Sequence, residues 1–512
     1  MDDGKPDESY SDEAVEAAAD EVLEDVAELG DPEGAPALPS AALAAAAAAA
    51  ATATGPDAAT DEPAVVSTQP EREIWGLAWP VILSQVLASA VSLVDIAMVG
   101  RLTREAVAAV GYTTQYVWLT QSVIFSIGIA CVAMMSRAVG AGEPDRARSA
   151  FAATLVVALT IALAITGVAF AAPEFLLGLL DAQPEIVELA VPYLLLVVGT
   201  TPLLAVSLTI ESAMRAVKDT RTPMIIAASI TVVKTVLNGL LIFGLFGFPR
   251  LELVGAGIAT VVSLVLGLVL FVAAVLRKGT DPVLRLRPRH FIAARAVLPQ
   301  VVRISLPAVG ERVLMNSAMM TYFTLLGTYG SAAIAAYTIG IRILSFTWIP
   351  GVGFSVASST LVGQSLGASR PEDAARAGWR AVRMAVQVSI VLGVIFAIGR
   401  EPLARAFSVD EGVITELIPF MLLLALSQPL LGLHFTLAGA LRGAGDTMTP
   451  LIAAGIGNWV FRVPLAYLVT RVFELPVIWV WWCLVFDHVA RGTILAIVFR
   501  RGRWKERLGA EV

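Results

Sequence analysis

The chain has 512 residues, of which 57% are hydrophobic and only 15% are charged. Soluble domains carry about a quarter charged residues, so this composition excludes an ordinary water-soluble globular protein and indicates an integral membrane protein. The formal net charge of -7 averages two unlike parts, because residues 1–70 hold 17 acidic side chains and one lysine while the remainder is basic. Two cysteines, Cys131 and Cys483, exclude a disulfide framework or a multi-cysteine metal site.

Residues 1–70 form an acidic, alanine-rich segment that we expect to be a disordered cytoplasmic tail, because it cannot bury enough apolar area to offset its ordering entropy. From Ile74 onward, apolar stretches long enough to cross a hydrocarbon layer of ~30 Å recur. We predict an all-α integral membrane protein with twelve transmembrane helices, near residues 74–99, 113–137, 148–171, 186–213, 222–246, 253–276, 299–327, 332–362, 373–398, 413–440, 450–472 and 476–499.

The loops between these helices differ in charge. Arginine and lysine are concentrated in alternate loops, and Arg215 and Arg442 are assigned to two of these basic loops. Basic loops face the cytoplasm, so we expect a protein of the cell membrane with both termini on the cytoplasmic side. The predicted division is an N-terminal lobe of six helices in 71–282, a cytoplasmic linker in 283–298, and a C-terminal lobe of six helices with a basic end in 299–507.

The two halves of the membrane part repeat each other at a spacing of 227 residues. The matching segments are Pro80 and Pro307, "VGAGEPDRA" (139–147) and "LGASRPEDA" (366–374), and "MRAVKDTRTP" (214–223) and "LRGAGDTMTP" (441–450). The spacing contains six helices, an even number, so each half begins on the same side of the membrane. Such parallel repeats are related by an axis along the membrane normal and enclose a cleft suited to alternating access.

The sequence has no phosphate-binding loop, no zinc signature and no soluble domain to hold one. We therefore expect no enzymatic activity, no cofactor and no nucleic-acid partner, and we expect transport to be driven by an ion gradient. The lipid bilayer, a small organic substrate and a coupling cation are the expected partners, and the expected functional unit is a monomer.

Several segments, in order, carry a family resemblance. They are "LAWPVILSQVLASAVSLVDIAMVGRL", "ESAMRAVKDTRTP", "LNGLLIFGLFGFPRLELVGAGIAT", "GVGFSVASSTLVGQSLGA" and "LAGALRGAGDTMTP". Over about residues 74–500 the chain resembles the multidrug and toxic compound extrusion (MATE) family, in its bacterial and archaeal transporter branch. The resemblance implies two pseudo-symmetric six-helix lobes and the export of organic, often cationic, compounds in exchange for protons or sodium ions.

The resemblance also implies an ion site in the N-terminal lobe. The family's first-helix pattern places an acid fifteen residues after a proline, which Pro80 and Asp95 match. Its fifth helix presents two polar positions four apart, often Asn followed by Asp or Asn, where this chain has Lys234 and Asn238. The amide is kept at the second position, but the first position has become a lysine.

Counting residues along the helices places these groups at similar depth. Asp95 is fifteen residues past Pro80, Asn238 is fifteen past Pro223, and Lys234 lies about one turn, roughly 6 Å, from Asn238. A lone charge in mid-membrane costs roughly 2.5–3.5 kcal/mol, so Asp95 and Lys234 should pair or line a wet cavity. A paired lysine would compete with Na⁺, which favours H⁺ coupling over a Na⁺ site at Asp95 and Asn238. The alternative is a permanent structural salt bridge, whose replacement by apolar residues would preserve transport.

Further candidates lie in both halves. In the first helix, Ser84 and Gln85 can contact substrate or bond neighbouring helices. In the C-terminal half, Glu311 is either a coupling acid or a structural partner of Arg312, Arg342 or Arg462. Asn458 and Arg462 on the eleventh helix are secondary candidates.

The predicted function is secondary antiport that exports organic compounds by alternating access between the two lobes. One alternative is a lipid-linked oligosaccharide or polysaccharide flippase of the same superfamily, which would require a strongly basic cavity. Another, from a different class, is a non-transporting membrane scaffold that acts through its acidic tail.

Overall fold

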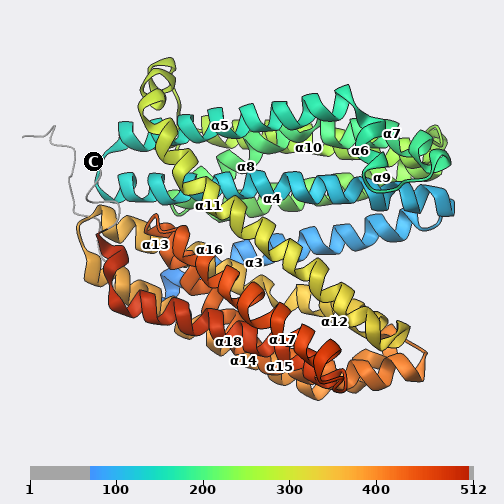
Figure 1. Ribbon diagram of the computed structural model, residues 1–512. Helices are drawn as coiled ribbons and strands as arrows, with labels where there is room; N and C mark the ends of the chain where they lie inside the picture. The colour runs from blue at the N-terminus through green and yellow to red at the C-terminus, as the bar shows by residue number, and fades with distance from the viewer. Residues whose placement is uncertain (1–69, 507–512) are drawn as a thin grey trace, which may run out of the picture. The chain divides into compact units, whose positions relative to one another are not determined.

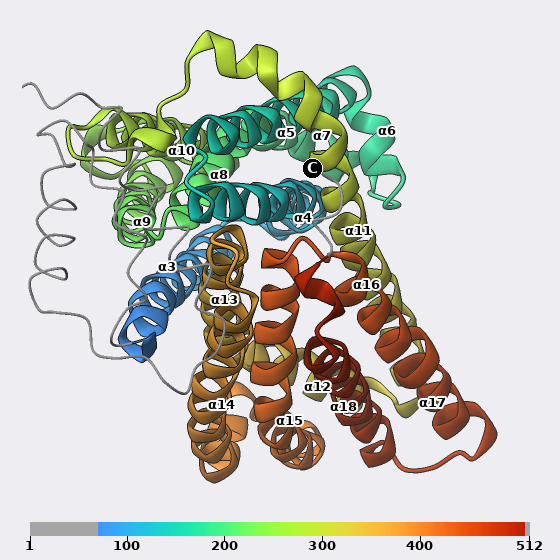
Figure 2. The same ribbon diagram turned by 90° about the vertical axis from the view of Figure 1, so that its left-hand side faces the viewer.

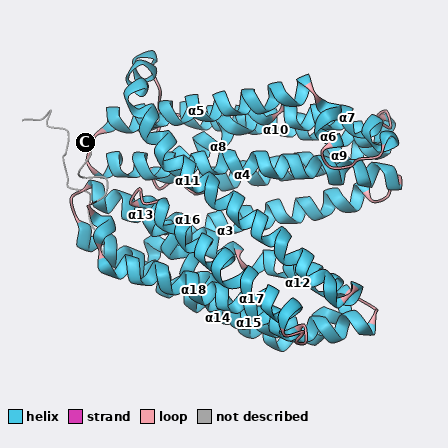
Figure 3. Ribbon diagram, in the orientation of Figure 1, coloured by secondary structure: helices cyan, strands magenta, loops and turns pink. Residues whose placement is uncertain are grey.

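The computed structural model describes residues 70–506, so the predicted disordered tail at 1–70 lies outside the described residues except for Pro70. The described part of the chain is built from helices and contains no strand (Figure 3). Within it, twelve helical segments are long and apolar enough to cross a membrane. These observations confirm the predicted all-α fold with twelve spans.

The first six spans lie between Pro70 and Leu276. They comprise α3 (Pro70–Val99), α4 (Arg104–Gly140), α5 (Pro144–Ala171), α7 and α8 (Pro184–Gly199 and Thr201–Ala216, one span), α9 (Arg221–Phe243) and α10 (Glu252–Leu276). A short helix, α6 (Pro173–Gly178), lies between α5 and α7.

The other six spans lie between Pro288 and Arg501. They comprise α11 (Pro288–Leu326), α12 and α13 (Ser331–Thr347 and Ile349–Gly367, one span), α14 (Pro371–Phe407), α15 (Glu411–Gly443), α16 and α17 (Met448–Gly455 and Val463–Tyr467, one span with its π-helical segments Ile456–Arg462 and Leu468–Val472) and α18 (Ile478–Arg501). Most helices extend several residues beyond their predicted ends, and α11 begins inside the predicted linker 283–298.

Prolines and glycines set many of these helix ends. Pro144 and Pro371 each occupy the start of the third helix of a half, where the missing N–H breaks no helical hydrogen bond. Gly244 (φ 70°) and Gly502 (φ 75°) end α9 and α18 in the left-handed conformation that glycine adopts without steric cost.

The first helix of each half crosses from one lobe to the other (Figures 1 and 2). The beginning of α3, with Ile74 and Ala78, is buried against α13 and α14, whereas its end at Val99 packs on α9 and α10. In the same way, the beginning of α11 packs on α4 and α5 through Val301, and its end at Tyr322 packs on α12, α15 and α18. Pro80 and Pro307 lie in these crossing helices, where each removes one backbone hydrogen bond.

Contacts between the lobes obey the sequence repeat. A Cβ at Gly140 would overlap the backbone of Gln364, and a Cβ at Gly367 would overlap the backbone of Arg137, the residue equivalent to Gln364. A Cβ at Gly363 would overlap Ser136, its own equivalent in the other half. Paired reciprocal contacts and a residue facing its own equivalent are the signature of a two-fold interface. An approximate two-fold axis therefore passes between α4 and α13.

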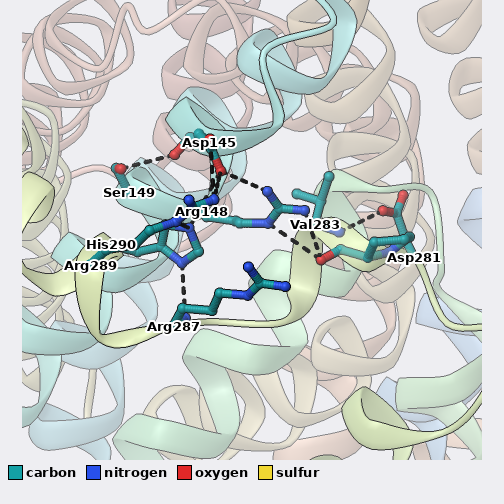
Figure 4. A network of polar contacts seen from close by, with 9 residues as sticks. Asp145, Arg148, Ser149, Asp281, Val283, Arg287, Arg289 and His290 are labelled. Carbon is teal, nitrogen blue, oxygen red and sulfur yellow. Dashed lines mark hydrogen bonds and ion pairs between the residues drawn. The ribbon is translucent and has the colours of Figure 1, made fainter.

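The segment that joins the two halves is fastened to the start of α5 (Figure 4). Asp145 Oδ1 accepts hydrogen bonds from Arg148 (2.7 Å) and Arg289 (3.2 Å), while Arg148 also donates to the carbonyl of Pro282. The Nδ1 atom of His290 accepts the backbone N–H of Arg287 at 2.9 Å, and Nε2 faces Asp145 at 3.4 Å. The connection between the halves is thus held by hydrogen bonds as well as by the packing of α11.

Candidate transport sites

The first candidate site lies in the N-terminal lobe between α3 and α9. Lys234 Nζ donates to Asp95 Oδ2 at 2.6 Å, and Asn238 Nδ2 donates to Asp95 Oδ1 at 2.5 Å. The Asp95 and Lys234 side chains are 23% and 24% exposed, whereas Asn238 is buried. The predicted pairing of Asp95 with Lys234 is confirmed.

Helix packing explains why these three groups meet. Lys234 and Asn238 are four residues apart, so they share one face of α9, and that face packs against the end of α3. Gly239 leaves room for the Met98 side chain, which brings the two helices together just beyond Asp95. Tyr193 on α7 packs at the same junction of α3, α9 and α10, against the cluster of Val99, Ile242 and Ala256. Sequence reasoning missed Tyr193, because nothing in its local pattern separates it from other aromatic residues of the spans.

One hydrogen-bond acceptor in this site has no donor. The Asn238 Oδ1 atom is buried and has no hydrogen-bond partner within the described residues 70–506. Both oxygens of Asp95, in contrast, already accept protein donors. Asn238 lies one helical turn from Lys234, so its Oδ1 atom can accept a hydrogen bond from the Lys234 ammonium when Asp95 is neutral.

The second candidate site is a cavity between the lobes with a volume of about 130 Å³. Its walls come from α4, α8, α11, α13 and α15, together with Trp348. The lining residues are Phe125, Gly128, Ile129, Val132, Ser212, Arg215, Glu311, Arg312, Met315, Trp348, Val352, Ser355, Val356, Ser359, Phe435, Gly439 and Arg442. Many of them are equivalent under the repeat, such as Arg215 and Arg442, so the cavity lies on the approximate two-fold axis.

Hydrogen bonds between the lobes close one end of the described structure next to this cavity. Thr360 Oγ1 donates to the carbonyl of Arg215 at 3.1 Å, and Gln364 Nε2 donates to the carbonyl of Ala216 at 2.7 Å. The glycine contacts around Gly140 and Gly367 lie at the same end. In Figure 1 the ribbons of the two lobes meet at this end and lie apart at the opposite one.

The charges of the cavity correct three sequence-based assignments. Glu311 accepts two hydrogen bonds from Arg442, at 2.6 and 2.7 Å, so its partner is neither Arg312 nor Arg342 nor Arg462. Arg215 and Arg442 lie in helices rather than in the expected loops, because α8 and α15 extend as far as these residues, and both line the cavity. Each has a carboxylate for a partner, because Glu211 pairs with Arg215 one turn earlier on α8.

Ser84 and Gln85 do not line the cavity, although their equivalents in the other half, Glu311 and Arg312, do. Ser84 instead donates to the carbonyl of Val81 at 2.9 Å. The cavity is therefore polar on the α11 side, and its charge does not follow the two-fold symmetry of its shape. Trp348, at the junction of α12 and α13 in the middle of one span, packs edge-on against Phe435 in the cavity wall.

The remaining candidates lie elsewhere in the C-terminal lobe. Buried Asp487 pairs with Arg491 and Arg462, each at 2.5 Å, and the Arg462 guanidinium lies 5.8 Å from the Tyr322 ring centre. Asn458 donates to the carbonyl of Ala454, and Arg342 is exposed on α12. None of these residues lines the central cavity.

A family model described as MatE matches residues 80–240 and 307–468, once in each lobe and over more than half of the chain. The chain belongs to the MATE family. Among relatives of this MATE protein, a probable multidrug resistance protein NorM of Bradyrhizobium diazoefficiens is 31% identical, with 83% of this chain and 92% of the relative covered. A probable NorM of Thermotoga maritima is 27% identical, with 85% and 93% covered.

The fold of this MATE protein matches that of solved transporters. A MOP superfamily transporter from Pyrococcus furiosus superposes with a TM-score of 0.77 at 22% identity, with 85% of this chain and 95% of that one covered. That protein is described as having a binding pocket of reverse polarity that suggests a different function. Together the family and the twelve spans establish a multi-pass membrane transporter.

Proposed function

We propose that this MATE protein is a multidrug exporter that moves small organic compounds across the cell membrane in exchange for a cation. The observation that carries the proposal is the Asp95–Lys234–Asn238 cluster inside a spanning lobe. Ionisable groups at this depth cost roughly 2.5–3.5 kcal/mol each on insertion scales, and they are characteristic of proton relays and ion pathways. The names of the NorM relatives support drug export as the direction of transport.

A proton is the cation that this cluster suits. Lys234 Nζ occupies the place beside Asp95 that a sodium ion would need, and each carboxylate oxygen already accepts a donor. A proton needs only one oxygen of Asp95 and no shell of ligands. When Asp95 takes up the proton, the ion pair is lost, and the Lys234 ammonium turns to the unused Oδ1 atom of Asn238.

The change at Asp95 reaches the other lobe through α3. Asp95 lies in the part of α3 that packs within the N-terminal lobe, whereas Ile74 and Ala78 pack on α13 and α14 across the interface. Pro80 weakens the helix between these parts and lets one move relative to the other. Protonation thus shifts the balance between states in which the cavity opens to opposite sides.

The arginine-rich loops support an orientation in which the closed end of the lobes and both termini face the cytoplasm. In this orientation the structure corresponds to a state in which the cavity is shut off from the cytoplasm by the Thr360 and Gln364 hydrogen bonds. A flippase for lipid-linked oligosaccharides is the second candidate, and the three arginines of the cavity favour it.

The test is dye export from vesicles that contain the purified full-length protein, under an imposed pH gradient or an imposed sodium gradient. Wild type is expected to respond to the pH gradient, and Asp95→Asn is expected to lose that response. Equal export by Asp95→Asn and wild type under both gradients would contradict the coupling role of Asp95.

A further inference from the structure

We propose that the central cavity binds organic anions, in the form of a flat apolar body that carries one carboxylate, sulfonate or phosphodiester group. The inference rests on the proposed export function and names its substrate class. It differs from the expectation, drawn from the family resemblance, of substrates that are often cationic.

The charge of the cavity is positive. Three guanidinium groups line it, and two of them are neutralised, Arg442 by Glu311 and Arg215 by Glu211. The third, Arg312, forms no ion pair or hydrogen bond within the described residues 70–506 and lies 5.6 Å from the centre of the Phe125 ring. One positive charge is therefore left over, which one anionic group on a ligand would balance.

Two of the lining arginines also carry buried hydrogen-bond donors that lack acceptors. The Nε atoms of Arg215 and Arg442 are buried, and neither has a partner in the part of the chain that the structure describes. Arg215 itself is only 7% exposed. Unsatisfied buried donors are unfavourable, and a small reorientation of either guanidinium group toward the oxygens of a bound anion would satisfy them. A cation would instead meet a carboxylate, Glu311, whose oxygens are already bound to Arg442.

The rest of the wall suits an apolar, flat molecule. Phe125, Trp348 and Phe435 supply aromatic faces, and Ile129, Val352 and similar side chains fill the surface between them. Aromatic side chains of this kind stack on rings of a ligand. An aromatic ring system that ends in one anionic group matches both parts of the cavity.

The break in two-fold symmetry gives the bound molecule its direction. Glu311 and Arg312 on α11 correspond to Ser84 and Gln85 on α3, which do not line the cavity. Arg312 and Arg442 both line the cavity. The anionic group is therefore held on the α11 side, between Arg312 and Arg442.

Two xanthene dyes of opposite charge test this inference: fluorescein, which carries a carboxylate and, at pH 7.5, a phenolate, is the anion, and rhodamine 123 is the cation. Their binding to the purified full-length protein is measured by fluorescence anisotropy at pH 7.5. Wild type should bind fluorescein at least tenfold more tightly than rhodamine 123, which corresponds to about 1.4 kcal/mol. Arg312→Gln should weaken fluorescein binding about tenfold without weakening rhodamine 123 binding.

Two further variants control for folding and for charge as such. Arg312→Lys keeps the positive charge and should retain most of the fluorescein affinity. Arg383→Gln removes an exposed arginine of α14 that lies outside the cavity, and it should leave both affinities unchanged. Tighter binding of rhodamine 123, equal weakening of both dyes in Arg312→Gln, or no binding of either dye would each overturn the inference.

A second experiment distinguishes an anionic lipid from a soluble anion as the ligand. Fluorescent phosphatidylglycerol that both displaces fluorescein and is moved between vesicle leaflets identifies a lipid headgroup as the source of the anion. Displacement of fluorescein by soluble aromatic carboxylates alone identifies a free compound. Gradient-driven export of rhodamine 123 but not fluorescein would leave the export function standing and refute the substrate class. Fluorescein binding without export of either dye would leave the ligand class standing and refute the export function.

Discussion

Replacing both members of the Asp95–Lys234 pair distinguishes a coupling site from a structural ion pair. Asp95→Asn alone leaves the Lys234 ammonium without its carboxylate. Because both side chains are about a quarter exposed, we expect a loss of about 1–3 kcal/mol of stability, below the range for a fully buried pair. The double variant Asp95→Leu/Lys234→Met leaves no charge behind, so its stability should return to near that of wild type.

Transport by the double variant should not return. One proton moving down a gradient of one pH unit supplies about 1.4 kcal/mol, enough to sustain roughly tenfold accumulation of a substrate exchanged one for one. The expected accumulation ratio in vesicles is thus near ten for wild type and near one for the double variant. Thermal unfolding in detergent reports stability on the same preparations. A double variant that is stable and accumulates substrate like wild type would show that the pair is only structural.

Three further predictions test other parts of the structure. Lys234→Ala removes the ammonium that excludes sodium, so a sodium gradient should drive at least severalfold more export than in wild type, and an unchanged sodium response would contradict the proposed exclusion. Glu311→Gln removes the buried carboxylate that pairs with Arg442. It should lower the free energy of unfolding by about 2–4 kcal/mol, which thermal unfolding measures. Gly367→Leu inserts a side chain where even a Cβ overlaps the backbone of Arg137, so it should open the closed end and increase maleimide labelling of a cysteine placed there by Thr360→Cys. The control Gly76→Leu adds a side chain in open space and should leave the labelling unchanged. Equal labelling in the two variants would contradict close packing at this end.

Much of the first site was predictable from sequence. Asp95 and Asn238 each lie fifteen residues past a proline in the same helix, Pro80 and Pro223, so regular helical rise places them at similar depth. The charge of Lys234 then requires a partner, and Asp95 is the acid at that height. The Gly140 and Gly367 contacts likewise follow the 227-residue spacing of the sequence repeat.

The charged cavity was not predictable in the same way. Helix ends inferred from sequence are uncertain by about 2–4 residues. Arg215 and Arg442 lie just past the predicted ends of their spans, so the sequence assigned them to loops. The partner of Glu311 comes from α15, 131 residues along the chain, and only tertiary packing brings the two together. Trp348 lies at the junction of two helices of one span, and the sequence does not show that its ring turns toward the cavity.

The central claim is that the Asp95 carboxyl carries the driving proton across the membrane. The direct measurement is proton flux driven by substrate alone, recorded with a pH-sensitive dye trapped in vesicles that contain wild type or Asp95→Asn. An outward substrate gradient should move protons inward in wild type, in fixed proportion to substrate, and should move none in Asp95→Asn. Proton movement of equal size in the two proteins would contradict the claim.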